Sequence, residues 1–180
     1  SGYKFIIILS GLTKDLRKQT HDRLDSGFFG FNTEHASILD SEYMLPLGKI
    51  RQEQKIKKPN TLTNSGINGD LNTSILRGAI NFQTEDAKLF CIKKNKTSLQ
   101  NVINYILKDP NINSKIEIDY SNYKFKKLSK IKDQPILIID DEVDHASVDT
   151  GMNAFDEEDN PNEEYNPKTI NRLIRMLLNM

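Results

Sequence analysis

Residues 135–147 read Pro-Ile-Leu-Ile-Ile-Asp-Asp-Glu-Val-Asp-His-Ala-Ser, an apolar run that ends in a group of acidic side chains. The unbroken apolar run from Ile136 to Ile139 predicts a strand covered on both faces, as in a parallel sheet flanked by helices. Charges just past the carboxyl end of such a strand lie where open α/β sheets bind their ligands. The stretch therefore predicts an α/β fold with a ligand site at this strand end. The charged residues there are Asp140, Asp141, Glu142, Asp144 and His145.

Two further segments, residues 3–10 and 88–93, are similarly apolar and predict neighbouring parallel strands. Each leads into a helical pattern. The first helix is expected to have Thr13 as its N-cap and to stop at Gly27. The second is expected to start at Thr97 or Ser98 and to end at the Asp-Pro pair 109–110. Its apolar face comprises Leu99, Val102, Ile103, Ile106 and Leu107. This alternation of strands and helices indicates a doubly wound α/β layer.

The last helix is expected to begin after an Asn166 N-cap, with Pro167 in its first turn. Its predicted apolar stripe comprises Ile170, Leu173, Ile174, Leu177 and Leu178. Residues 31–86 show little periodicity and stay unassigned, although residues 64–69 resemble a loop. The acidic segment 151–166 predicts a mobile loop. We expect one domain over residues 1–180.

Composition excludes several classes of protein. The chain carries 25 basic and 25 acidic residues, so no net charge favours a nucleic acid or a membrane. A local basic groove would be hidden in this balance. No apolar stretch approaches the roughly 20 residues of a transmembrane helix. The single cysteine, Cys91, lies in an apolar run, which predicts an inert buried thiol and fits a reducing cytoplasm.

Asp141 and Glu142 match a known pair of catalytic roles. In RecA-like nucleoside triphosphatases, an aspartate at a strand end holds hydrated Mg²⁺, and the next glutamate polarises the attacking water. Asp144 and His145 then follow where related enzymes couple nucleotide state to a second domain. If Asp140 held the metal, the next residue, which polarises the water, would be Asp141, and an aspartate is less usual in that role than a glutamate. The simpler interpretation is a strand end followed by a solvated acidic turn.

The chain lacks the phosphate-cradling loop Gly-x-x-x-x-Gly-Lys-Ser/Thr. Residues 65–70 contain glycines but no lysine, and no convincing strand precedes them. A metal-dependent nuclease that uses the acidic strand end directly is another hypothesis, although a second carboxylate cluster with a lysine is missing. His21 and His35 are scattered and are expected to be solvated. The basic residues 124–127 include an aromatic that could stack on a base, or they are solvated surface.

Four segments, in order along the chain, resemble one family. They are residues 2–24, which contain Leu16-Arg17, Gln19-Thr20 and Arg23-Leu24; residues 92–95 with the helix that follows; residues 138–147; and residues 166–178. The family is the Z-one domain, the helicase-like ATPase part of predicted bacterial restriction endonucleases. The segment between residues 31 and 86 adds little to the resemblance.

The resemblance implies a superfamily-two, RecA-like helicase lobe that uses ATP and Mg²⁺ and acts on DNA. Asp141 then corresponds to the Mg²⁺ ligand and Glu142 to the water-activating residue, while Asp144 and His145 are candidate nucleotide-linked residues. It also implies that five residues lie near the nucleic acid: Gln19, Arg23, Lys93, Lys94 and Asn95. The simpler interpretations are a solvated helix face for Arg17 and Arg23, and helix packing for the Gln-Thr pair.

The family's phosphate loop belongs immediately before Gly2, and its third motif belongs just past Met180. We therefore expect an internal piece of the first motor lobe, without the second lobe, that binds neither ATP nor Mg²⁺ tightly and shows no ATP turnover by itself. The competing hypothesis is a nucleic-acid or protein binding module that keeps the fold and needs no ATP.

Overall fold

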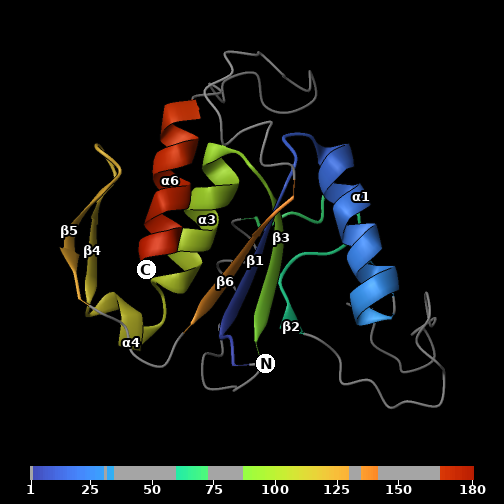
Figure 1. The fold of residues 1–180 in the computed structure, drawn as a ribbon, viewed down its shortest axis with the longest axis horizontal. Coiled ribbons are helices and arrows are strands. Elements are labelled where there is room, and N and C mark those ends of the chain that lie inside the picture. The colour runs from blue at the N-terminus through green and yellow to red at the C-terminus, as the bar shows by residue number, and fades with distance from the viewer. Residues whose placement is uncertain (1, 31, 35–59, 73–86, 130–134, 142–166) are drawn as a thin grey trace.

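The computed structural model describes residues 2–30, 32–34, 60–72, 87–129, 135–141 and 167–180. Its centre is a parallel four-stranded sheet in the order β2-β3-β1-β6 (Figure 1). The strands are β1 (Phe5–Ser10), β2 (Asn60–Thr61), β3 (Lys88–Lys93) and β6 (Ile136–Asp140). The predicted parallel α/β sheet is confirmed at this level. The short β2 was not predicted, because two residues carry no periodicity.

Alternating side chains of β1 and β3 build two separate cores. Phe5, Ile7 and Leu9 point to one face, where α3 (Lys96–Ile106) and α6 (Pro167–Asn179) pack. The intervening residues point to the other face, which α1 (Lys14–Leu24) covers (Figure 1). This period of two is the geometry of a strand, and both faces are apolar because helices cover both.

The first helix begins as predicted and ends later than predicted. The Thr13 side chain accepts a hydrogen bond from the Leu16 N–H, which confirms Thr13 as the N-cap. The helix does not stop at Gly27. It continues into the π-helical turn η1 (Asp25–Phe29), and Gly30, at φ 75°, forms the C-cap. Only this glycine adopts the left-handed conformation there that a C-cap requires.

The second helix also has a different cap from the one predicted. Asn95, and neither Thr97 nor Ser98, is the N-cap, since its side chain accepts a hydrogen bond from the Ser98 N–H. The predicted apolar face is buried, with Leu107 partly so. After the helix, Asp109 caps the short α4 (Pro110–Asn113).

An antiparallel hairpin follows, formed by β4 (Ile116–Asp119) and β5 (Lys124–Leu128). It packs beside α6, away from the central sheet (Figure 1). The sequence analysis did not predict it, because β5 is rich in lysine and its alternation is broken by a bulge.

Two predictions about burial were wrong. Leu178 of α6 is 65% exposed, and Met176 takes its place in the core. β6 is an outer strand of the described sheet, and its residue Ile139 is 44% exposed, so the strand is not covered on both faces. The acidic segment 151–166, the Asn166 cap and most of residues 31–86 lie outside the described residues. Within the described part of the chain, no helix combines the length and apolarity that crossing a membrane requires.

Candidate functional site

Polar residues gather at the carboxyl ends of the three long strands. In the parallel register Ser10 of β1 lies beside Lys93 of β3, and Leu9 lies beside Asp140 of β6. Because all strands run in the same direction, the residues that follow them meet at one edge of the sheet. This is the edge where α/β sheets bind ligands, as the sequence predicts for the acidic strand end.

Asp141 is fixed at this edge by both its backbone and its side chain. Its N–H donates to the Leu9 carbonyl at 2.9 Å, which continues the pairing of β6 with β1. The Thr20 hydroxyl of α1 donates to the Asp141 carboxylate, with Oγ1 to Oδ2 at 2.9 Å. The side chain therefore faces α1, and two segments 121 residues apart form one contact. Thr20 does more than pack its helix.

The neighbouring carboxylate has a different partner. Asp140 forms an ion pair with Lys94, whose side chain is 0% exposed, while that of Asp140 is 21% exposed. A buried ammonium needs a counter-charge, and the Asp140 carboxylate supplies it. The two adjacent aspartates thus differ: Asp140 balances a buried lysine, and Asp141 binds a hydroxyl.

The residues that the resemblance places near nucleic acid divide into two groups. Gln19 and Arg23 are exposed on α1, where a ligand can reach them. Lys93 and Lys94 lie at the end of β3 as expected, but both are buried. The expectation of a direct nucleic-acid contact at Lys94 does not fit this structure, because its ammonium is enclosed and paired. Asn95 uses its side-chain oxygen to cap α3.

Arg17 is buried and holds a loop against α1. Its guanidinium donates to the carbonyl of Asn64 at 2.8 Å and to the carbonyl of Gly66. The loop closes on itself through a bond from the Asn64 N–H to the Gly69 carbonyl at 2.9 Å. The interpretation of Arg17 as part of a solvated helix face was wrong, because the helix packs against a loop whose backbone carbonyl groups accept hydrogen bonds from Arg17.

Asp70 connects this loop to the end of β3 and the start of α3. Its carboxylate accepts a hydrogen bond from the Ser98 hydroxyl at 2.9 Å and from the Leu71 N–H at 2.7 Å. Burial raises the pKa of the Asp70 carboxyl, and these hydrogen bonds only partly oppose the rise. Nothing in the sequence singled out Asp70, because its partners are distant in the chain.

His21 is buried in a polar network and is not solvated as predicted. One ring nitrogen lies 3.2 Å from the Thr63 hydroxyl, and the other lies 3.3 Å from Asp25. The Thr33 N–H and hydroxyl also donate to Asp25. Burial would raise the pKa of the Asp25 carboxyl, but the hydrogen bonds from His21, Thr33 and Ser65 outweigh it and lower the pKa.

Cys91 is buried in the centre of β3, as predicted. Burial raises the pKa of its thiol to about 12. The thiolate is the nucleophilic form, and a thiol with so high a pKa forms little of it at neutral pH, so Cys91 is unreactive.

Several predicted site residues lie outside the described residues: Glu142, Asp144, His145 and His35. Among the residues that are described, no three histidine, cysteine or acidic side chains form a group that could hold a metal ion.

Comparison with protein-family models, with curated proteins and with solved structures found no match to this chain. The function must therefore be argued from the site itself.

Thr20, Asp70 and Lys94 make contacts at this edge that sequence reasoning did not assign. The sequence did point to Thr20, since it belongs to the Gln-Thr pair in the segment of residues 2–24 that resembles the family. Lys94 was expected at the correct strand end, but its partner was not foreseen.

Proposed function

We propose that this chain is part of the first RecA-like lobe of a helicase-like motor of the Z-one type, which couples ATP hydrolysis to work on DNA. The observation that supports it best is the contact between Thr20 and Asp141 at the carboxyl edge of the sheet. It joins two of the segments that carry the resemblance, in one candidate site.

Asp141 suits a Mg²⁺ ligand. Mg²⁺ prefers hard oxygen donors and is commonly held by one or two carboxylates, with waters and phosphate oxygens completing its shell. The Thr20 hydroxyl donates a hydrogen bond to one oxygen of the Asp141 carboxylate and thereby orients the carboxylate. When bound, Mg²⁺ would neutralise charge that develops on the transferred phosphoryl group. Asp140 suits this role less well, because Lys94 already compensates its charge.

Glu142 follows Asp141 directly in the sequence and is the proposed general base. Its role is to accept a proton from the attacking water, as a carboxylate within hydrogen-bonding reach can do. Gln19 and Arg23, exposed on α1, are the proposed contacts to the DNA backbone.

The pairing of Asp140 with Lys94 also bears on the nuclease alternative. A nuclease built on the acidic strand end needs several free carboxylates to hold its metal ions. Since one of them is used to balance a buried lysine, the motor is the better-supported proposal.

The test is ATP hydrolysis, with and without DNA, by the complete protein that contains this chain. Glu142→Gln should lower turnover by orders of magnitude and leave nucleotide binding intact, since it removes the base and not the phosphate contacts. Glu117→Gln, at an exposed position of β4, is the matched control and should hydrolyse ATP at the wild-type rate. Unchanged turnover in Glu142→Gln would overturn the proposal.

A further inference from the structure

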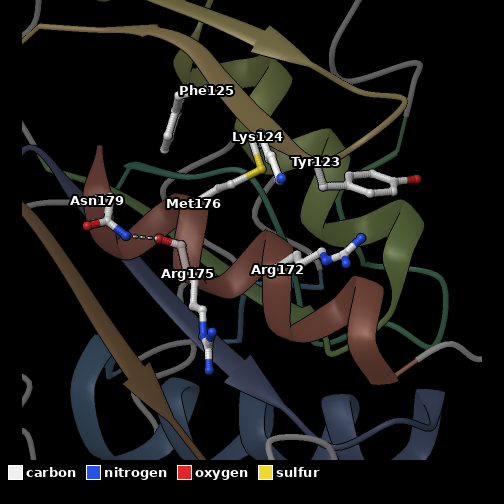
Figure 2. Close-up of a pocket in the computed structure, with 7 residues that line it drawn as sticks. All are labelled: Tyr123, Lys124, Phe125, Arg172, Arg175, Met176 and Asn179. Carbon is white, nitrogen blue, oxygen red and sulfur yellow. Dashed lines mark hydrogen bonds between the residues drawn. The ribbon is translucent and has the colours of Figure 1, made fainter.

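A cavity of about 330 Å³ lies between the β4–β5 hairpin and α6 (Figure 2). This volume is at the lower end of the roughly 300–1,000 Å³ of small-ligand sites. The cavity is on the α3 and α6 side of the sheet, whereas Thr20 belongs to α1 on the other side (Figure 1). Its lining consists of Tyr123, Lys124, Phe125, Arg172, Arg175, Met176 and Asn179.

The charged residues of this lining are all cationic. Lys124, Arg172 and Arg175 carry positive charge, and no acidic side chain from the described parts of the chain lines the cavity. Within the described residues, none of these three side chains forms an ion pair. In Figure 2 the side chain of Arg172 extends toward the hairpin, and that of Arg175 points away from it. Lys124 and Arg172 are therefore the cations best placed to meet an anionic ligand in the cavity.

Tyr123 gives the cavity an aromatic wall in an unusual conformation. Its φ is 49°, which makes it the only non-glycine residue with positive φ in the described structure. A bulky side chain rarely adopts this region, and such strain persists where the surrounding structure holds it. Here Gln100 of α3 donates to the Tyr123 hydroxyl at 3.4 Å. Phe125 and Met176 add apolar surface to the cavity lining.

We propose that this cavity binds a nucleotide unit of single-stranded nucleic acid. Lys124 and Arg172 would contact the backbone phosphate, and the Tyr123 ring would stack on the base. Proteins that hold single strands combine these two features, a positive groove and an aromatic platform. An acidic protein segment would satisfy the cations but would not use the ring. The proposal stands apart from ATP hydrolysis, because the cavity shares no residue with the Thr20–Asp141 site.

The test measures binding of a fluorescent oligodeoxythymidine to the 180-residue chain by anisotropy at several salt concentrations. Each of Lys124→Ala and Arg172→Ala should weaken binding and reduce the slope of log K against log salt by about 0.7. Lys4→Ala removes the same charge at the amino end of β1, outside both the cavity lining and α1, and is the matched control. If the control weakened binding equally, the binding would be non-specific electrostatic attraction, and the proposal would be overturned.

Tyr123 variants separate stacking from charge. Tyr123→Phe keeps the ring and should bind as the wild type does. Tyr123→Asn removes the ring and introduces a residue that tolerates positive φ. Binding should weaken about fivefold or more, while circular dichroism should show that the fold is intact. Wild-type binding by Tyr123→Asn, or displacement of the strand by polyglutamate as readily as by unlabelled oligonucleotide, would overturn the proposal. Oligonucleotide binding is measured on the 180-residue chain without ATP, whereas the proposed function is tested by ATP hydrolysis of the complete protein, so the two proposals fail independently.

Discussion

Lys94 and Asp140 illustrate how a buried charge depends on an ion pair. Lys94 ends in a fully enclosed ammonium, and Asp140 reaches it from the end of a different strand. A buried charge without its partner is far more costly than the pair itself is stabilising. The pair also leaves Asp141 as the carboxylate that faces α1.

Asp140→Ala should lower the free energy of unfolding by about 3 kcal/mol, because it removes the carboxylate that pairs with the buried Lys94 ammonium. Urea unfolding of the 180-residue chain measures this. Glu117→Ala removes an exposed carboxylate and should change stability by less than about 0.5 kcal/mol. Adding Lys94→Met to Asp140→Ala should restore most of the loss. Equal stabilities of Asp140→Ala and Glu117→Ala would contradict the assignment.

Thr20 is a positioning residue, since it acts through Asp141. In the complete protein, Thr20→Val should raise the Mg²⁺ concentration for half-maximal ATP hydrolysis about tenfold, because groups that orient a metal ligand affect affinity on this scale. Thr20→Ser keeps the hydroxyl and should retain the wild-type Mg²⁺ dependence. A purely structural role would instead lower the melting temperature of Thr20→Val and leave the Mg²⁺ dependence unchanged.

At the scale of elements, the loop of residues 62–72 depends on the close approach of two of its segments. A Cβ added at Gly69 would lie 2.1 Å from the Asn64 side-chain oxygen and 2.2 Å from the Asn64 carbonyl oxygen. The loop can close around Arg17 and present Asp70 to Ser98 only because residue 69 has no side chain.

Gly69→Ala should therefore lower the free energy of unfolding by about 1–3 kcal/mol through overpacking. Gly27→Ala is the control, since nothing lies within 4 Å of the Cβ it would add. There the helical backbone should accept alanine with a small gain, at most about 1 kcal/mol. Chemical denaturation of both variants gives the comparison. A loss at Gly27 as large as that at Gly69 would contradict this account.

Elements with strong periodicity could be predicted from the sequence, and those without it could not. The three long strands β1, β3 and β6 followed from apolar runs, and the helix after β3 followed from the spacing of Leu99, Val102 and Ile103. The end of α1 was misplaced because two glycines, Gly27 and Gly30, are equally good stop signals in sequence. The lysine-rich β5 was missed because its stability comes from pairing with β4, which no local pattern reports.

At the scale of the whole molecule, two carboxylates oppose each other in the pH dependence of stability. The pKa of Asp25 is lowered by its hydrogen bonds, and the pKa of Asp70 is raised by burial. A lowered pKa in the folded state stabilises the fold above the ordinary aspartate value of 3.8, and this contribution disappears as the pH falls through the lowered pKa. Asp70 acts with the opposite sign.

The comparison of wild type with Asp25→Asn isolates the first contribution. The wild type should be more stable than the variant at neutral pH, and the difference should shrink as the pH falls below about 4. Urea unfolding between pH about 7 and about 3 measures this difference. A difference that stays constant over the whole range would show that Asp25 does not contribute through its charge.

The sequence by itself determined the parallel α/β layer and the edge of the sheet where the acidic residues lie, because hydrophobic periodicity and strand direction are local properties. Only the tertiary structure decided which charges are paired. The contacts of Thr20 with Asp141, of Lys94 with Asp140, and of Arg17 with the loop carbonyls join residues far apart in the chain. The cavity beside Tyr123 likewise exists only where the hairpin meets α6. The physical reason is that burial and electrostatic pairing depend on distance in space, which local sequence patterns do not record.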